Sequence, residues 1–320
     1  MCRLRARLAA VAVLASIAVL GGCAVGERGP RDPSASLIVT RDFGTERLDQ
    51  VEVPRAAAHR DALALLASTR RVEREGSRVL AVDGVRAGPG QEWRPLVNGL
   101  DPALGPPFAP GREPKVLGTL APGDVVQWDL RATGVRAPAT VGAFPEPLLS
   151  GFAGRRFPVR LECEDTEGPA CSIARERLEA RGVPVSIGIL GTQGGPTLAR
   201  VIVAPWAVAR RIAALLPLEG DARRTGAYAR FVDEGRRLEL LDAEGRATPA
   251  PPGTGLVTAM RPGTDAPTWA VTGVDSAGLE AAARSLDERA LRDRYAVAAT
   301  PGRLRALPLE GSAGAGRPAR

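Results

Sequence analysis

Short apolar stretches separated by turn residues make up residues 36–131. Five of these stretches have the composition of β-strands, namely residues 37–40, 48–53, 79–82, 92–97 and 125–131. Residues 57–70 instead carry apolar side chains three and four positions apart, which predicts an amphipathic helix. The resulting order of strand, strand, helix and three strands predicts a mixed sheet that packs on one helix.

Residues 155–310 show a different pattern, in which strand-like and helix-like stretches alternate. Strands are expected at residues 156–163, 183–190, 198–204, 226–232, 237–241, 255–260, 269–273 and 295–299. Helices are expected at residues 171–181, 206–216 and 276–286, the last with Ser276 as its N-cap. This alternation predicts a layered α/β domain with a partly parallel sheet. The fold class predicted for the chain is therefore α+β in the N-terminal domain, followed by α/β.

Three further stretches are expected to lie outside these two domains. Residues 23–35 lack a periodic apolar face and are rich in glycine and proline, which predicts a flexible tether. Residues 311–320 are expected to form a flexible tail. Residues 132–154 connect the domains, and their prolines exclude a regular helix, so this stretch is either a linker or a packed loop.

The N-terminus has the features of a secretory signal peptide over residues 1–22. Three arginines precede a charge-free stretch of 13 residues at 8–20, which is shorter than the roughly 20 residues of a membrane-spanning helix. The following Leu-Gly-Gly-Cys at residues 20–23 resembles a bacterial lipobox. This resemblance implies acylation of Cys23, which would anchor the protein on the outer face of the cell membrane. The alternative is an ordinary secretory signal followed by an unmodified cysteine.

The export signal also determines how the four cysteines are interpreted. Cys2 belongs to the signal peptide and Cys23 is the expected acylation site, so Cys163 and Cys171 remain. Two cysteines eight positions apart in an exported protein predict a disulfide. The alternative is a redox pair, which the spacing does not favour because it is not Cys-x-x-Cys.

Ordered motifs give residues 36–131 a resemblance to a known family. These motifs are Val-Asp-Gly at 82–84, Trp-Arg-Pro-Leu-Val-Asn-Gly at 93–99 and Gly-Asp-Val-Val-Gln-Trp at 123–128. They resemble an uncharacterised β-grasp family that is similar to the C-terminal domain of transcobalamin and intrinsic factor. The sequence departs from the family pattern at Pro95 and Leu96, where family members often carry aromatic residues.

The resemblance implies a β-grasp domain and suggests cobalamin as a possible ligand. In transcobalamin, however, this domain works together with a helical barrel, which has no counterpart in the pattern of this sequence. Trp93, Asn98 and Trp128 are the candidate ligand-binding residues. Their structural alternatives are a tight turn for Asn98 and a place in the core for the two tryptophans.

Composition narrows the possible chemistry. The chain of 320 residues has a single histidine, His59, which excludes a three-histidine metal site. The net charge is +7, but the basic residues, all arginine apart from Lys115, are scattered and not interleaved with aromatics. Nucleic acid is therefore not expected as a partner. No metal site and no cofactor are predicted.

Other candidate sites have structural alternatives. The glycine-rich turns at residues 188–195 and 273–276 match neither a dinucleotide fingerprint nor a P-loop. Asp83, Asp124 and Asp129 either converge or serve as turn and strand-end residues. The acidic loop at 162–167 lacks the pattern of a calcium-binding EF-hand.

Three classes of function are consistent with these features. The first is a lipid-anchored extracytoplasmic binding protein that captures a small molecule or docks to an uptake system. The second is a structural or protein-interaction lipoprotein of the cell envelope. The third, an exported enzyme, is the least favoured because the sequence contains no nucleophile motif, so no catalytic residue is proposed.

Overall fold

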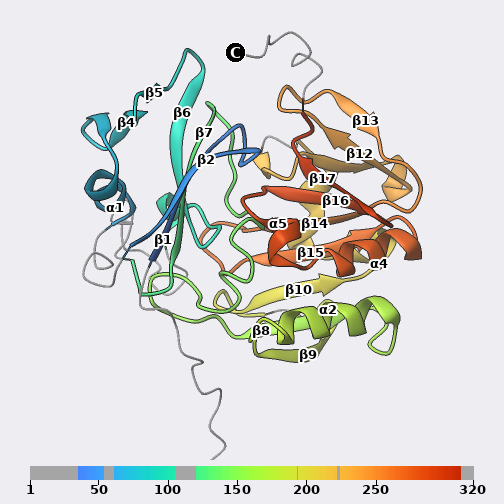
Figure 1. Cartoon of the computed structure of the whole chain (residues 1–320). Coiled ribbons are helices and arrows are strands. Elements are labelled where there is room, and N and C mark those ends of the chain that lie inside the picture. Colours follow the sequence, from blue (N-terminus) through green and yellow to red (C-terminus); the bar gives the residue numbers. More distant parts are fainter. Residues whose placement is uncertain (1–34, 54–60, 106–119, 193, 222–223, 311–320) are drawn as a thin grey trace, which may run out of the picture.

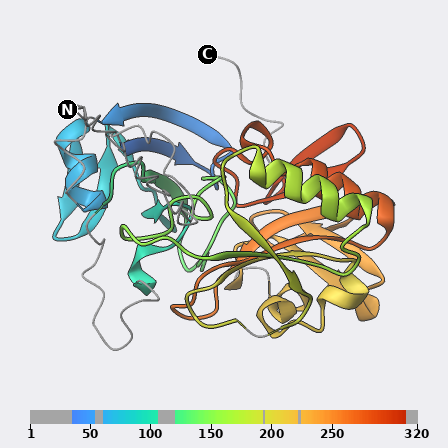
Figure 2. The same cartoon turned by 90° about the horizontal axis from the view of Figure 1, so that it is seen from below.

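The computed structural model describes residues 35–53, 61–105, 120–192, 194–221 and 224–310 (Figure 1). Within these residues the protein is a mixed α and β structure in which strands predominate. The two largest sheets lie side by side (Figures 1 and 2). No helix in the described ranges is long and apolar enough to cross a membrane. Cys23, most of the predicted tether and the predicted tail lie outside the described residues.

The first sheet contains four strands in the order β2-β1-β7-β6. Their bounds are β1 (Ala35–Arg41), β2 (Glu46–Val53), β6 (Gln91–Val97) and β7 (Val125–Ala132). β1 and β7 run parallel at the centre, and β2 and β6 pair with them in antiparallel orientation. The helix α1 (Ala62–Thr69) buries Leu65 and Leu66 in the same core as this sheet.

A small antiparallel sheet lies beside the first one. It contains β3 (Val72–Glu75), β4 (Arg78–Val82) and β5 (Val85–Arg86). The five strands expected between residues 36 and 131 are thus confirmed as β1, β2, β4, β6 and β7. The sequence did not indicate β3 and β5, because their side chains are mostly charged and exposed and so lack an apolar pattern.

The largest sheet has seven strands in the order β17-β16-β14-β15-β10-β8-β9. Four of them run parallel, namely β8 (Val159–Cys163), β9 (Val185–Ile189), β10 (Ala199–Val203) and β15 (Thr268–Gly273). The other three add on in antiparallel orientation, namely β14 (Gly255–Met260), β16 (Ala296–Thr300) and β17 (Arg303–Leu307). The sheet is therefore partly parallel, as predicted.

Both faces of this sheet are covered. The helices α2 (Pro169–Glu179) and α4 (Ser276–Arg284) pack against one face and against each other. The opposite face shares a core with the three-stranded sheet of β11 (Ala229–Val232), β12 (Arg237–Leu241) and β13 (Ala247–Pro249). The described residues also form short helical segments, among them α5 (Glu288–Leu291) and the 3₁₀ helices η2 (Pro102–Leu104) and η5 (Asp233–Gly235).

The helix expected at residues 206–216 is wrong. The chain forms only α3 (Trp206–Ala209), followed by the 3₁₀ helix η3 (Ala213–Glu219). Ile212 lies between them in an extended conformation with φ −88° and ψ 113°. Pro217, inside η3, lacks the amide hydrogen that an α-helix would need there. The apolar spacing was correct, because Trp206, Ala209 and Leu215 are all buried, but the backbone reaches these positions without a continuous helix.

The N-cap of α4 is also different from the one expected. Asp275, not Ser276, caps the helix, and its Oδ1 accepts a hydrogen bond of 2.7 Å from the amide of Gly278. A carboxylate at this position is also stabilised by the positive end of the helix dipole.

The stretch at residues 132–154 is a packed loop, one of the two alternatives left open. Val141, Phe144, Leu148 and Phe152 are all buried. They belong to a core that also contains residues from both large sheets, for example Val126. The loop therefore joins the two halves of the molecule, built on the four-stranded and the seven-stranded sheet, through apolar contacts.

Candidate functional site

A polar cleft of about 440 Å³ lies where the first sheet meets the packed loop and the segment after α5. One wall comes from β1, β2 and β7, and includes Ile38 and Arg47. A second wall is formed by residues 142–146 and Leu149 of the packed loop. The third contains Arg292 and Asp293. The volume is in the range of small-molecule sites.

Asp293 is held rigidly at this cleft by its backbone. Its φ is +63°, in the left-handed region that non-glycine residues seldom adopt. Its amide donates to the carbonyl of Gly142 at 2.9 Å, and its own carbonyl accepts from Nε2 of Gln127 at 3.2 Å. Gly44 approaches so closely that an added Cβ would lie 1.8 Å from the Asp293 carbonyl oxygen. Strained residues fixed in this way are frequent at functional sites.

The carboxylate of Asp293 is buried but only partly satisfied. Its side chain is 6% exposed, and Oδ2 accepts bonds of 2.8 and 2.6 Å from Nε and Nη2 of Arg47. Oδ1 is buried and finds no hydrogen-bond partner in the part of the chain that the structure describes. Burial raises the pKa of Asp293 above its usual value, against the opposing attraction of Arg47. The unpaired oxygen leaves this acid with capacity for one further hydrogen bond.

A buried polar network centred on Asp129 lies behind the cleft. Asp129 accepts bonds from Thr40 Oγ1 at 2.7 Å, from the Gly44 amide at 3.1 Å and from the Tyr295 hydroxyl at 2.8 Å. Arg131 donates to the same hydroxyl at 2.6 Å. Burial raises the pKa of Asp129, although these hydrogen bonds and Arg131 oppose it. The network connects β1 and β7 to Tyr295, which directly precedes β16, and so fixes the two sheets relative to each other.

In the described residues there is no group of three or more His, Cys, Asp or Glu side chains placed to hold a metal ion. The cleft is lined by Asp293, two arginines and an apolar wall that includes Phe144, and Oδ1 of Asp293 is closed off from solvent.

The predicted ligand-binding residues lie elsewhere, in the interior of the first half. Trp93 and Trp128 are 4% and 2% exposed and belong to the same core as Leu65 of α1. Nε1 of Trp128 donates to the carbonyl of Ala62 at 3.1 Å. Neither tryptophan lines the cleft, which agrees with the core alternative given for them above.

Asn98 is likewise buried and fully engaged. Its Nδ2 donates to Oδ1 of Asp124 and to the carbonyl of Gly151, both at 2.8 Å, and its Oδ1 accepts from the amide of Val125 at 2.8 Å. Its φ of +52° is that of a tight turn. These contacts give Asn98 a structural role in joining the turn to β7.

The three aspartates considered as a convergent set serve different structural purposes. Asp83 adopts a turn with φ +48°, and its Oδ1 accepts from the Arg71 amide at 2.9 Å. Asp124 binds Asn98, and Asp129 belongs to the buried network. Of the two glycine-rich turns, the first is tied to β8 by a bond of 3.0 Å from the Gly191 amide to Glu162.

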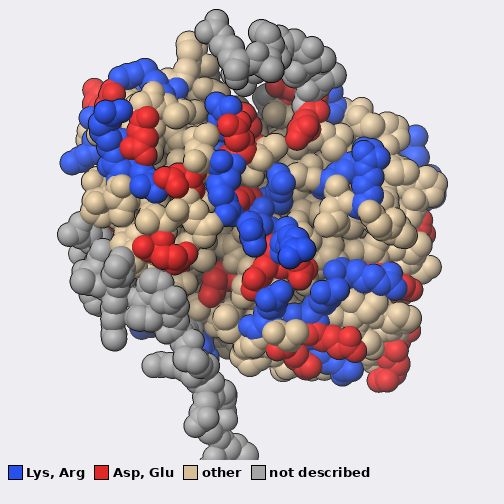
Figure 3. Space-filling model, viewed as in Figure 1, with Lys and Arg blue, Asp and Glu red and all other residues tan. Residues whose placement is uncertain are grey.

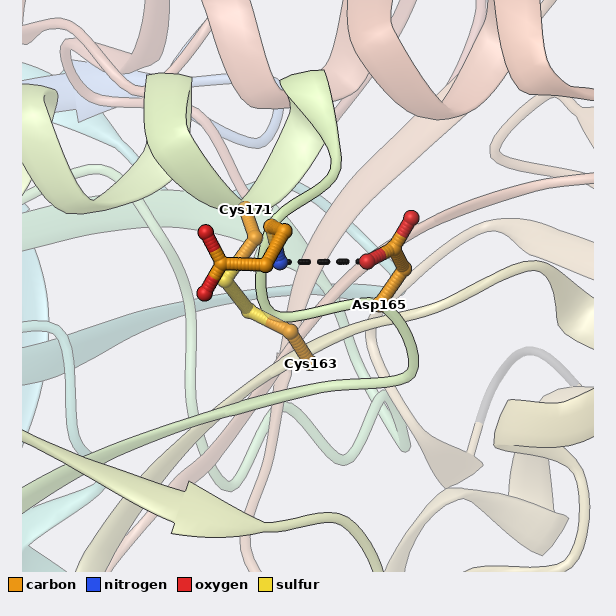
Figure 4. Close-up of a disulfide and its surroundings, with 4 residues drawn as sticks. Cys163, Asp165 and Cys171 are labelled. Carbon is orange, nitrogen blue, oxygen red and sulfur yellow. Dashed lines mark hydrogen bonds between the residues drawn. A yellow bond between two sulfur atoms is a disulfide. The ribbon is translucent and has the colours of Figure 1, made fainter.

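The predicted disulfide between Cys163 and Cys171 is confirmed (Figure 4). It links the end of β8 to the first turn of α2, with the two Cα atoms 5.9 Å apart. Asp165, within the closed loop, accepts a bond of 3.1 Å from the amide of Glu167. Both cysteines are 3% exposed, which favours a structural role over a redox role.

Comparison of the chain with protein-family models, with curated proteins and with solved structures found no match. The resemblance of residues 36–131 to the transcobalamin-like family therefore depends on the motifs alone.

The residues that form the cleft were not predicted from the sequence. Asp293 is one acid between Arg292 and Arg294, just before an apolar strand, and such a pattern is common at exposed turns. Its burial depends on Gly44 and Gly142, which lie far from it in the sequence.

Proposed function

We propose that this protein is a lipid-anchored binding protein on the outer face of the cell membrane. The support for the anchor is the signal-peptide pattern and the lipobox-like sequence that ends at Cys23. We further propose a β-grasp domain at residues 36–131 and a layered α/β domain at residues 155–310. The parallel pair at the centre of the first sheet supports the former, and the parallel strands with α2 and α4 on one face support the latter.

The ligand of this protein would occupy the polar cleft between the two halves. One observation carries this proposal: Asp293 combines a left-handed backbone with a buried carboxylate oxygen that has no partner among the described residues. An unsatisfied buried acceptor costs about 1–3 kcal/mol. A ligand that donates a hydrogen bond to Oδ1 would remove this cost, and it would have to shift the Asp293 side chain or its neighbours to reach this atom.

The chemistry of the lining indicates the class of ligand. Asp293 and Glu288 favour a donor such as an amino or hydroxyl group, and Arg47 holds the acid in place. Ile38 and Phe144 would contact an apolar portion. A small polar molecule with both features fits about 440 Å³. Cobalamin is too large to be enclosed in this volume, so only a side group of a corrinoid would enter.

A thermal-shift screen on residues 24–320 tests the proposal. The screen would contain small amines, polyols and corrinoids, and a ligand at about 100 times its Kd should stabilise the fold by about 2.7 kcal/mol.

Variants then locate the site. Asp293→Asn should abolish the shift, because an asparagine that keeps its oxygen on Arg47 places an NH2 donor at the position of Oδ1 and removes the negative charge. Asp42→Asn is the matched control, since Asp42 also has a positive φ, of 53°, but is exposed and does not line the cleft. A ligand that stabilises Asp293→Asn as strongly as the wild type would disprove binding at this cleft.

A protein-interaction lipoprotein is the second candidate, favoured by the edge strand β9. Ile187 and Ile189 are 46% and 82% exposed on this strand, which has only one neighbour in its sheet. Exposed apolar edge strands readily pair with another chain. Cross-linking on whole cells tests this function: Ile189→Lys should remove any adduct formed at β9, whereas adducts that persist would place the contact elsewhere.

A further inference from the structure

Four arginines line a cavity of about 520 Å³ on the face formed by α4, α5 and the hairpin of β16 and β17. We call this cavity the arginine groove, which is lined by Arg177, Arg284, Arg289 and Arg303. Asp287 is the only acidic residue in the lining. Figure 3 shows basic side chains spread over α4, α5 and the strands above them.

Two of these arginines have no acidic partner in the described residues. Arg284 pairs with Glu280 at 2.6 Å, and Arg177 lies 3.7 Å from Asp287. Arg289 and Arg303, both exposed, form no ion pair within the described ranges. Asp287 is already shared by Arg177 and Arg181, which lies 3.3 Å from its Oδ2.

The fold presents these charges together. Arg303 follows Pro301 and Gly302, whose φ is +81°, in the tight turn between β16 and β17. The next residue, Leu304, is 49% exposed and also lines the groove. The groove therefore combines unpaired guanidinium groups with an exposed apolar side chain at its rim.

We infer that the arginine groove binds the phosphate headgroups of anionic phospholipids at the membrane surface. Arginine presents several N–H donors in a planar fork that matches phosphate oxygens. Leu304 would contact the less polar region beneath the headgroups. The inference rests on the proposed anchor: residues 24–34 span at most about 40 Å from Cys23 to β1, so an acylated protein remains near the membrane.

Vesicle co-sedimentation of residues 24–320, without the lipid anchor, tests the groove independently of Cys23 and of the cleft. Vesicles of phosphatidylcholine with about one third phosphatidylglycerol should bind the protein, and pure phosphatidylcholine vesicles should not. The double variant Arg289→Glu/Arg303→Glu should lower the partition coefficient by about tenfold or more. Raising the salt from about 0.1 M to about 1 M should release the wild type.

Matched controls separate the groove from general charge. Arg78→Glu/Arg175→Glu changes the net charge equally at two exposed arginines outside the groove, and should retain binding. Asp293→Asn should also bind vesicles normally, so a failure of the cleft proposal would leave this result unaffected. Equal vesicle binding by wild type and groove variant would overturn the inference, and so would binding of free glycerol phosphate without binding to vesicles.

Discussion

Glu162 is fully buried on β8, between two arginines that neutralise it. Arg200 donates two bonds to its carboxylate, of 2.8 and 2.7 Å, and Arg160 donates one of 2.8 Å. Burial alone would raise the pKa of Glu162, but the hydrogen bonds from Arg200 and Arg160 outweigh burial and leave the pKa below its usual value of 4.5. The ionised form of this residue therefore stabilises the fold.

We expect Glu162→Gln to lower the free energy of unfolding by about 3 kcal/mol at neutral pH, because two arginines lose their buried partner. The contribution of Glu162 is complete above its ordinary pKa of 4.5 and is lost as the pH falls through the lowered pKa of the folded state. The difference between the two proteins should therefore shrink in acid. Urea unfolding between about pH 2 and pH 7 measures this.

Glu239→Gln is the control for Glu162→Gln. Glu239 pairs with Arg230 at 2.8 Å, but this pair is partly exposed, so its loss should cost less than about 1 kcal/mol. Equal effects of the two substitutions would contradict the importance of the buried pairing.

For single residues, the sequence predicted the role correctly only where that role depends on residues nearby in the chain. The disulfide could be predicted, because export and an even number of remaining cysteines leave a single pairing. Asp293 could not be recognised, since nothing near it in the sequence reveals that Gly44 and Gly142 will enclose it. Trp93 and Trp128 illustrate the reverse case: their motif suggested a ligand site, and the structure buries them in a core.

Between secondary-structure elements, the closest approach described joins α4 to β14. A Cβ added to Gly255 would lie 1.9 Å from the carbonyl oxygen of Gly278, and one added to Gly278 would lie 2.5 Å from that of Thr254. Two glycines that face each other thus let the helix lie directly on the strand. Neighbouring alanines, among them Ala282, have small side chains that keep the helix close to the strand along the rest of this contact.

Gly278→Ala should therefore destabilise the protein by about 2–3 kcal/mol, because the backbone contact between α4 and β14 cannot expand without moving the helix. This cost should exceed the gain in helix propensity of about 1 kcal/mol. Gly195→Ala is the matched control, since no atom lies within 4 Å of its added Cβ. Thermal unfolding that ranks the two variants in the opposite order would show that the contact is loose.

The pattern of apolar residues predicted most strands, because a buried strand appears in the sequence as a short apolar stretch. It failed at residues 206–216, where the apolar positions are buried as expected but Ile212 is extended. Periodicity reports which side chains turn inward, and Trp206 and Leu215 do so here through two short segments instead of one helix.

For the molecule as a whole, Arg261 links the two halves. It lies at the end of β14, is 4% exposed and donates to the carbonyls of Asp265 at 2.8 Å and Asp101 at 3.2 Å. It also bonds to the carbonyl of Gly105, and its guanidinium lies 5.5 Å from the ring centre of Phe152. Burial lowers the pKa of Arg261 to about 10, so it remains charged at neutral pH.

We expect Arg261→Met to lower the free energy of unfolding by at least about 3 kcal/mol, because several buried carbonyls lose their donor at once. The variant should also unfold in a less cooperative transition, since residues 101–105 would be released from β14. Chemical denaturation followed by tryptophan fluorescence and by circular dichroism measures both effects. Coincident transitions with an unchanged midpoint would mean that Arg261 does not hold the halves together.

The anchor gives a second prediction at this scale. Cys23→Ala should leave the precursor unprocessed or release the protein from the membrane fraction, because the thiol that would carry the lipid is absent. Fractionation and mass measurement of the N-terminal peptide check this. Normal processing and membrane retention in the variant would contradict lipidation.

In the proposed complex, a ligand in the cleft donates a hydrogen bond to Oδ1 of Asp293. Carbon NMR of its side-chain carboxyl during a pH titration tests this most directly, in the free protein and with a ligand from the screen. We predict a pKa above the ordinary 3.8 in the free protein, because burial disfavours the charged form. Bound ligand should lower it by donating to Oδ1. An ordinary pKa in the free protein, or one that the ligand leaves unchanged, would contradict the assignment of this cleft as the binding site.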